Sequence, residues 1–267
     1  MRFPVVLFSC LLLAPLAPAA DDPPPEKVTR AIKLFNGRDL DGWYTWLREA
    51  HYEDPAKVFT VADGMIHISG EQWGGIATRR AFRDYHLITE WKWGTKTWKP
   101  REKAARDAGI LVHGAGPDGS YHETWLASIE SQIIEGGSGD FLVVPGAVKP
   151  RLTADIRQEG NQFIWKVGGT PITKESGRFN WFGRDPKWTD TLGFRGAQDV
   201  EKPVGQWNRH EVICDGDTIT NIVNGVVVNY AYNSTVTGGK IQLQSEGAEI
   251  YFRRVELRPI KKHVTHR

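Results

Sequence analysis

The feature that most constrains this chain is a long series of short runs in which apolar and polar residues alternate. Such alternation is the period of a strand with one buried face. After residue 30 no amphipathic pattern exceeds about two helical turns. We expect strands at 58–61, 65–68, 86–93, 109–113, 128–134, 141–144, 151–157, 163–167, 210–214, 218–223, 226–230, 240–244 and 249–257. This number of short strands predicts an all-β, two-sheet antiparallel sandwich or jelly roll.

Turn residues separate these runs at the positions that hairpins require. Ala62-Asp63-Gly64 divides the first pair of runs, and Asn224-Gly225 joins two alternating runs near the C-terminus. Asn-Gly is the strongest short hairpin signal, because both residues tolerate positive φ. Two segments carry no such pattern: 95–107, which is basic, and 177–202, which is rich in tryptophan and charge. We expect both to be long surface loops, which are often functional.

The first nineteen residues predict a signal peptide. Arg2 supplies a positive start, 3–16 is an almost continuous apolar run, and Ala17-Pro18-Ala19 offers small residues for cleavage. The run is too short to span a bilayer, and no second stretch approaches that length. We therefore expect a mature chain that begins near Ala20, has no membrane span and is secreted or periplasmic.

The remaining organisation follows from composition. We expect a disordered lead at 20–30, a single domain at 31–260 and a basic tail at 261–267. Cys10 lies in the signal peptide, so the mature chain keeps only Cys214 and has no intramolecular disulfide. The net charge of +2 falls to +1 without Arg2, which does not favour nucleic acid as a partner. The eleven tryptophans suit either a core or stacking on sugar rings.

The densest polar cluster on an expected strand is Glu130-Ser131-Gln132-Ile133-Ile134-Glu135. Alternation places Glu130 and Gln132 on one face. Glu135 joins them only if a bulge near 133–134 adds one residue. These side chains fit either a sugar cleft with acid/base carboxyls or an ordinary exposed strand face.

Other candidates surround the cluster. His113 ends an expected strand, where it could transfer protons, and Arg106 could orient a carboxylate or polarise a substrate oxygen. Asp107 and Trp125 are candidate substrate-binding residues beside them. The chain lacks G-x-S-x-G, H-E-x-x-H, clustered cysteines and phosphate-loop glycines, so we predict no metal site and assign no cofactor.

Several segments, in the right order, resemble motifs of one family. They lie at 34–43 (LFNGRDLDGW), 59–66 (FTVADGMI), 107–110 (DAGI), 130–133 (ESQI), 205–208 (GQWN), 223–225 (VNG), 239–244 (GKIQLQ) and 251–255 (YFRRV). Together they resemble the 3-keto-disaccharide hydrolase family over nearly the whole mature chain. Ala108 and Ile129 depart from the Ser and Tyr that the family usually carries there.

This resemblance implies a concanavalin-A-like sandwich that cleaves glycosidic bonds beside a sugar oxidised at C3. The ketone acidifies the C2 hydrogen, so a base removes that proton while the C1 substituent departs, and water then adds. Glu130 is the leading acid/base candidate, with Glu135 and His113 secondary. Gln132 would orient the substrate and Arg106 would stabilise the enolate.

Two alternatives stay open at this stage. E-x-Q-x-x-E resembles the E-x-D-x-x-E signature of laminarinase-like retaining glucanases, although Gln132 lacks the charge of the central aspartate. A carbohydrate-binding lectin without catalysis would use the same fold. The sugar, the linkage and the oligomeric state are not determined by the sequence.

Overall fold

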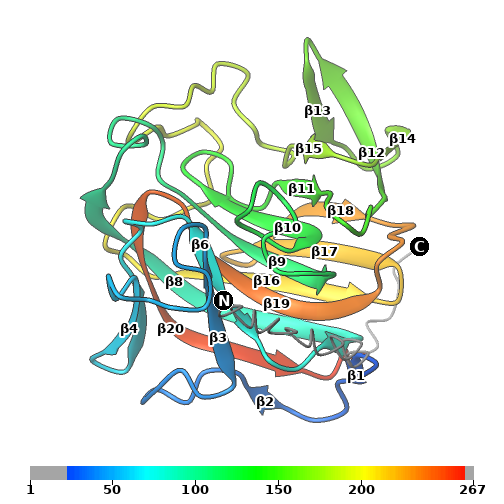
Figure 1. The fold of residues 1–267 in the computed structure, drawn as a ribbon. Helices are drawn as coiled ribbons and strands as arrows, with labels where there is room; N and C mark the ends of the chain where they lie inside the picture. Colours follow the sequence, from blue (N-terminus) through cyan, green and yellow to red (C-terminus); the bar gives the residue numbers. More distant parts are fainter. Residues whose placement is uncertain (1–22, 262–267) are drawn as a thin grey trace, which may run out of the picture.

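The computed structural model describes residues 23–261, and within them the chain forms strands and no helix. Two large sheets pack face to face, and a small third sheet projects from one end (Figure 1). Strand pairing is antiparallel except between β1 and β7. The all-β prediction is confirmed, and the arrangement is a concanavalin-A-like sandwich.

The front sheet carries most of the predicted site residues. Its strand order is β1-β7-β19-β9-β10-β11-β15, and β6 pairs with both β19 and β3. The strands are β1 (Glu26–Lys27), β3 (Trp43–Leu47), β6 (Gly74–Thr78), β7 (Phe82–Arg83), β9 (Asp107–Ala115), β10 (Ala127–Ile134), β11 (Phe141–Val144), β15 (Gly177–Phe179) and β19 (Gly238–Ser245).

The back sheet has the order β18-β17-β16-β8-β20-β5-β4, and β2 pairs with β20. Its strands are β2 (Ile32–Lys33), β4 (Phe59–Ala62), β5 (Met65–Ile68), β8 (Tyr85–Thr97), β16 (Asn208–Asp215), β17 (Thr218–Val223), β18 (Val226–Ala231) and β20 (Ala248–Arg258). The small sheet contains β12 (Leu152–Glu159), β13 (Gln162–Trp165) and β14 (Thr170–Lys174). It stands above the main sandwich in Figure 1.

Both predicted hairpin turns have the backbone that the sequence requires. Asp63 and Gly64 adopt φ of 52° and 72° between β4 and β5. Asn224 and Gly225 adopt 50° and 84° between β17 and β18. Successive positive φ values match the right-handed twist of the paired strands, which is why Asp-Gly and Asn-Gly close these hairpins.

The apolar core lies between the two large sheets. Ile110, Ile129 and Ile133 contribute from the front sheet, and Trp91 and Phe252 from the back sheet. We call the other side of the front sheet, which points away from this core, the open face. Side chains at alternate positions of β9, β10 and β19 therefore divide between the core and the open face.

A buried polar group interrupts the core at Ser131. The Ser131 hydroxyl donates to Asn221 Oδ1 at 2.9 Å and lies 2.8 Å from His210 Nε2. Burial lowers the pKa of His210 to about 3, so this imidazole is neutral. Because Ser131 points into the core, its neighbours Glu130 and Gln132 point to the open face.

Residues 23–30 of the predicted N-terminal lead are more ordered than expected, and residues 20–22 lie outside the described part of the chain. Glu26–Lys27 forms β1, which pairs with Phe82–Arg83, and Val28 is buried in the core. Backbone pairing and the burial of Val28 hold this segment against the sandwich, although its prolines favoured disorder. The predicted signal peptide at 1–19, and the predicted tail beyond Lys261, lie outside the described residues.

The two predicted loops connect strands beside the front sheet. The predictions of loops at 95–107 and 177–202 were wrong at their ends, because 95–97 continue β8, Asp107 begins β9 and 177–179 form β15. The arginine loop (98–106) joins β8 to β9, and the tryptophan loop (180–207) joins β15 to β16. They are bonded to each other: Ala105 N–H donates to Asp190 Oδ1 at 3.0 Å, and Leu192 N–H donates to the Lys103 carbonyl at 2.9 Å. The two loops thus lie together where β9 begins and β10 ends.

Candidate active site on the open face

Strand register places the predicted polar residues in rows across the open face. Glu130 lies opposite Leu111, and Leu111 lies opposite Gln242. One row further, Gln132 lies opposite Gly109. Directly paired residues of antiparallel strands project from the same face. The prediction that Glu130 and Gln132 share one face is therefore supported by the register.

Gly109 makes room for the Glu130 carboxyl. A Cβ at position 109 would overlap Glu130 Oε1 and would lie 2.5 Å from Gln244 Oε1. Gly75 does the same for Gln242, whose Cγ would lie 2.7 Å from a Cβ there. Since any larger side chain would push these groups aside, the glycine of the Asp107-Ala108-Gly109 segment has a steric role under the site.

The environment of Glu130 favours its protonated form. Burial raises the pKa of Glu130 to about 8, and the negative charge of Asp107 adds to this rise. Arg178 and a hydrogen bond from Gln244 oppose it. At neutral pH most Glu130 side chains therefore carry a proton and can donate it.

Asp107 differs from Glu130 in having an ionic partner. Burial raises the pKa of Asp107 to about 6, while the nearby Arg101 guanidinium opposes the rise. Arg101 Nη2 lies 3.2 Å from Asp107 Oδ2. Burial, with Asp107 and Glu130 nearby, also raises the pKa of Glu246 well above its usual value. At pH 7 Asp107 is mostly ionised beside a protonated Glu130.

Five side chains on this face present a buried polar atom without a protein hydrogen-bond partner in the described part of the chain. They are Asp107 Oδ1, Glu130 Oε1, Gln132 Oε1, Gln242 Nε2 and Gln244 Oε1. Buried polar atoms are normally paired with protein, water or ligand. A cluster of unpaired donors and acceptors is the pattern expected where hydroxyl-rich ligands bind.

Aromatic side chains lie along one end of the polar rows. Trp125 is buried, donates from Nε1 to the Gly74 carbonyl at 3.1 Å, and stacks with Trp73 at 5.7 Å between centroids. The ring of Tyr121 lies 6.3 Å from that of Trp125. Burial raises the pKa of Tyr121, with smaller contributions from Glu130 and Glu246, which places its hydroxyl within electrostatic reach of the carboxyls.

Glu135 lies on the other side of the strand, away from Glu130. The predicted bulge at 133–134 is wrong: register is continuous from Ile129 to Ile134 and shifts only between Ala127 and Ile129. Without the extra residue, period-two alternation turns Glu135 away from the open face.

The Glu135 carboxylate instead forms a buried pair with Arg106. Arg106 Nη1 lies 2.7 Å from Oε1, and the backbone N–H groups of Arg106 and Gly193 donate to Oε2 at 3.0 and 2.7 Å. Since Arg106 belongs to the arginine loop and Gly193 to the tryptophan loop, Glu135 fastens both loops to the sheet. This pairing occupies Arg106, the residue expected to stabilise an enolate.

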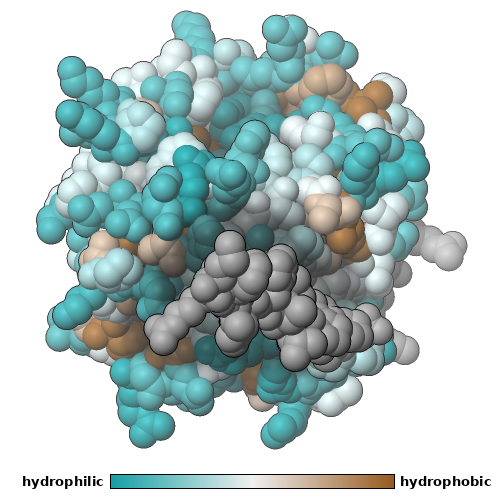
Figure 2. Space-filling view, viewed as in Figure 1, coloured by the Kyte–Doolittle hydropathy of each residue, from teal (hydrophilic) through white to brown (hydrophobic). Residues whose placement is uncertain are grey.

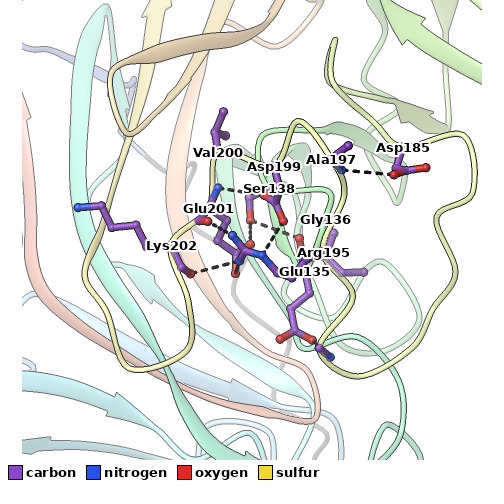
Figure 3. A network of polar contacts seen from close by, with 12 residues as sticks. Glu135, Gly136, Ser138, Asp185, Arg195, Ala197, Asp199, Val200, Glu201 and Lys202 are labelled. Atoms are coloured by element: carbon purple, nitrogen blue, oxygen red, sulfur yellow. Dashed lines mark hydrogen bonds and ion pairs between the residues drawn. The ribbon is translucent and has the colours of Figure 1, made fainter.

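A second buried carboxyl group, that of Glu201, anchors the tryptophan loop from within (Figure 3). Trp93 Nε1–H and the Ser138 hydroxyl each donate to Glu201 at 2.7 Å. Burial raises the pKa of Glu201 to about 8. Arg195 donates to the backbone carbonyls of Glu201 and Lys202, so this part of the loop is held by its own polar network.

His113 does not lie beside the carboxyl groups of Glu130 and Asp107. Its Nδ1 lies 2.9 Å from the Val236 carbonyl, and its ring packs edge-on against Tyr85 of the back sheet at 5.7 Å. Burial lowers the pKa of His113 to about 4. A neutral imidazole packed against the back sheet does not face the substrate side.

Sequence reasoning assigned no role to Gln242, Gln244, Glu246, Tyr121 or Arg178. The signal for the first three was present, because Gln242-Leu243-Gln244-Ser245-Glu246 alternates polar residues at the end of a strand. Only the pairing of β19 with β9 places them beside Glu130. Tyr121 and Arg178 come from other segments, and no local pattern connects them to the cluster.

Neither a metal-binding cluster nor a membrane-spanning helix occurs in the described part of the chain. Residues 23–261 contain no group of three or more His, Cys, Asp or Glu side chains able to hold a metal ion. They also contain no helix of the length and apolar character that a bilayer crossing requires.

Fold and site together define a concanavalin-A-like sandwich with an acid- and amide-lined open face. The chain belongs to the 3-keto-alpha-glucoside-1,2-lyase-like domain family, whose model matches residues 30–258. It is therefore a carbohydrate-active, glycosidase-like protein. A comparison with curated proteins finds no match.

The chain is similar, at low sequence identity, to several solved structures. A proposed glycosyl hydrolase from Parabacteroides distasonis has a TM-score of 0.51 at 18% identity, covering 87% of this chain and 94% of that one. A β-glucanase from Bacillus licheniformis has a TM-score of 0.46 at 10% identity, covering 87% and 99%. The carbohydrate-binding module CBM66 from Bacillus subtilis has a TM-score of 0.45 at 10% identity, covering 80% and 94%.

Proposed function

We propose that the protein is a secreted or periplasmic enzyme that cleaves glycosidic bonds of 3-keto-glycosides. The observation that carries this proposal is the unequal pair of carboxyls on the open face. Glu130 holds a proton at neutral pH, whereas Asp107 is mostly ionised and keeps Oδ1 free of protein partners. Two carboxyls with different protonation states supply an acid and a base at the same pH.

In the first step Asp107 removes the C2 proton of the keto sugar. The C2–H electrons form a C1=C2 double bond, the C1–O bond breaks, and Glu130 gives its proton to the departing oxygen. The Gln132 amide offers an N–H donor for the C3 ketone oxygen, on which charge develops. The products of this step are an enone and the free alcohol.

In the second step water adds across the double bond. The Glu130 carboxylate takes a proton from the water molecule while the water oxygen bonds to C1. Protonated Asp107 then returns a proton to C2. Both carboxyls regain their starting states, so the net reaction is hydrolysis. Neither step requires a covalent sugar–enzyme bond.

A retaining glucanase is less well supported by the same geometry. That chemistry needs two carboxyls about 5–5.5 Å apart across one sugar. In the E-x-Q-x-x-E segment the central residue is an amide, and Glu135 is occupied by Arg106 away from the open face. The second carboxyl of the glucanase signature is thus not available beside Glu130.

The deciding experiment measures turnover of 3-keto-glucosides and of their unoxidised parents. We expect cleavage of the keto substrates alone, slowed by deuterium at C2. Glu130→Gln and Asp107→Asn should each reduce kcat about 10²–10⁴-fold. Glu175→Gln, which changes a carboxyl that is 65% exposed, is the matched control and should leave kcat unchanged.

The pH profile provides an independent check on the two roles. Activity needs ionised Asp107 and protonated Glu130, so kcat/KM should fall below about pH 6 and above about pH 8. Equal cleavage of unoxidised β-glucan would contradict the proposal and favour the glucanase. Sugar binding without turnover of either substrate class would favour a lectin.

The export part of the proposal has its own measurement. N-terminal sequencing of protein recovered outside the cytoplasm should read from about residue 20. An intact Met1 would contradict it.

A further inference from the structure

A pocket lies between the small sheet and the tryptophan loop. It has a volume of about 370 Å³, and its walls include Phe163, Lys174, Arg178, Asn180, Arg184 and Trp188. Figure 1 shows the small sheet and this loop rising on the same end of the sandwich. None of the residues predicted from sequence to form the site lines this pocket.

Strand register connects the pocket to the carboxyl cluster. Arg178 in β15 lies opposite Leu142 in β11, and Leu142 lies opposite Glu130 in β10. Two strand spacings separate Arg178 from Glu130, which is about 10 Å between backbones. The charges of Glu130 and Asp107 contribute to the raised pKa of Arg178, so the two sites are within electrostatic reach.

The pocket has an excess of positive charge. Its ionisable lining residues within the described chain are Lys174, Arg178 and Arg184, with no carboxylate among them. Asp140, beneath the pocket, accepts from both Arg178 Nη1 at 2.7 Å and Arg184 Nη1 at 3.0 Å. Three cationic side chains and the single Asp140 carboxylate therefore give the lining and Asp140 together a net charge of +2.

Two of these cations have hydrogen-bonding capacity left for a ligand. Lys174 donates one bond to the Arg178 carbonyl at 2.7 Å and lies 3.8 Å from the centroid of the Phe163 ring. An ammonium group has three donors, so further donors remain. Arg184 is buried, yet its Nε has no protein partner, and its guanidinium lies 4.0 Å from the Trp188 ring centroid.

We infer that this pocket binds an anionic group, a carboxylate or a sulfate ester, carried by the sugar next to the ring at Glu130. Charge-assisted hydrogen bonds from Lys174 and Arg184 would hold the anion. This inference rests on the proposed function for the position of the neighbouring ring, but its binding test does not.

The test measures binding of D-glucuronate, glucose 6-sulfate and glucose by ligand-observed NMR and tryptophan fluorescence. We expect at least one anionic sugar to bind about ten-fold more tightly than glucose, with a preference that declines with salt. The carboxylate and sulfate probes distinguish the two sources of charge. Because this test measures binding and not turnover, it still tests the anion pocket if the proposed enzymatic function is wrong.

Variants of Lys174 connect the binding to the pocket. Lys174→Gln should remove most of the preference for the anionic sugar, and Lys174→Arg should retain it. Lys166→Gln, which removes an exposed lysine outside the pocket lining, is the matched control. Equal binding of all three sugars, or an anion preference that Lys174→Gln leaves intact, would overturn the inference.

Discussion

Replacing Glu130 by glutamine should stabilise the protein at neutral and alkaline pH. The folded chain holds this carboxyl protonated to about pH 8, whereas the ordinary value is 4.5. Between these values the unfolded chain releases a proton that the folded chain retains. Stability from this group is therefore fully present below about pH 4.5 and is lost as pH rises through about 8.

The size of the effect follows from the shift in pKa. Each unit corresponds to 1.36 kcal/mol, so the rise from 4.5 to about 8 sets a ceiling near 5 kcal/mol above pH 8. Glutamine has nearly the same shape and does not titrate. The variant should match the wild type near pH 4 and exceed its stability progressively up to about pH 8.

The assay is urea unfolding of both proteins at a series of pH values from 4 to 9. Glu175→Gln serves as the control, because an exposed carboxyl should give a difference of less than about 1 kcal/mol at every pH. A constant difference between wild type and Glu130→Gln would refute the reasoning. So would a difference that moves in favour of the wild type as pH rises, because either result means that folding does not raise the pKa of Glu130.

Two further substitutions test the residues that position the site, Gly109 beneath Glu130 and Glu135 between the two loops. Gly109→Ala places a Cβ against the Glu130 carboxyl, so we expect kcat to fall about 10²-fold or more, with a loss of only about 1–3 kcal/mol in stability by urea unfolding; unchanged kcat would contradict the steric role. Glu135→Gln breaks the buried pair with Arg106 and should cost about 3–5 kcal/mol and speed hydrogen exchange in both loops, whereas Glu159→Gln, at an exposed ion pair, should do neither. Unchanged exchange would show that the loops do not depend on this pair.

Much of the fold could be predicted from the sequence because it is encoded locally. Alternating residues identified the strands, since one face of each is buried, and Asp63-Gly64 and Asn224-Gly225 identified hairpins by their tolerance of positive φ. The shared face of Glu130 and Gln132 followed from the same period of two, as did the default position of Glu135 on the opposite face.

Register and pairing decided what the local pattern could not. Because no bulge forms at 133–134, Glu135 points away from the open face and pairs with Arg106. The pairing of β19 with β9 places Gln244 beside Glu130. Whether a bulge forms, and which strands become neighbours, depends on contacts between segments far apart in sequence. The prolines of the lead favoured disorder, but β1 pairs with β7. This pairing also depends on contact between segments that are far apart in sequence.

The sequence by itself determined the strands, the tight turns and the family motifs, because each depends on residues within one short segment. Only the tertiary structure decided which carboxyl is protonated and that Arg106 pairs with Glu135. The pKa of Glu130 depends on burial and on Asp107, Arg178 and Gln244, which come from three other strands. A short segment of sequence does not determine how much solvent is excluded, or which charges come close, when distant strands pack together.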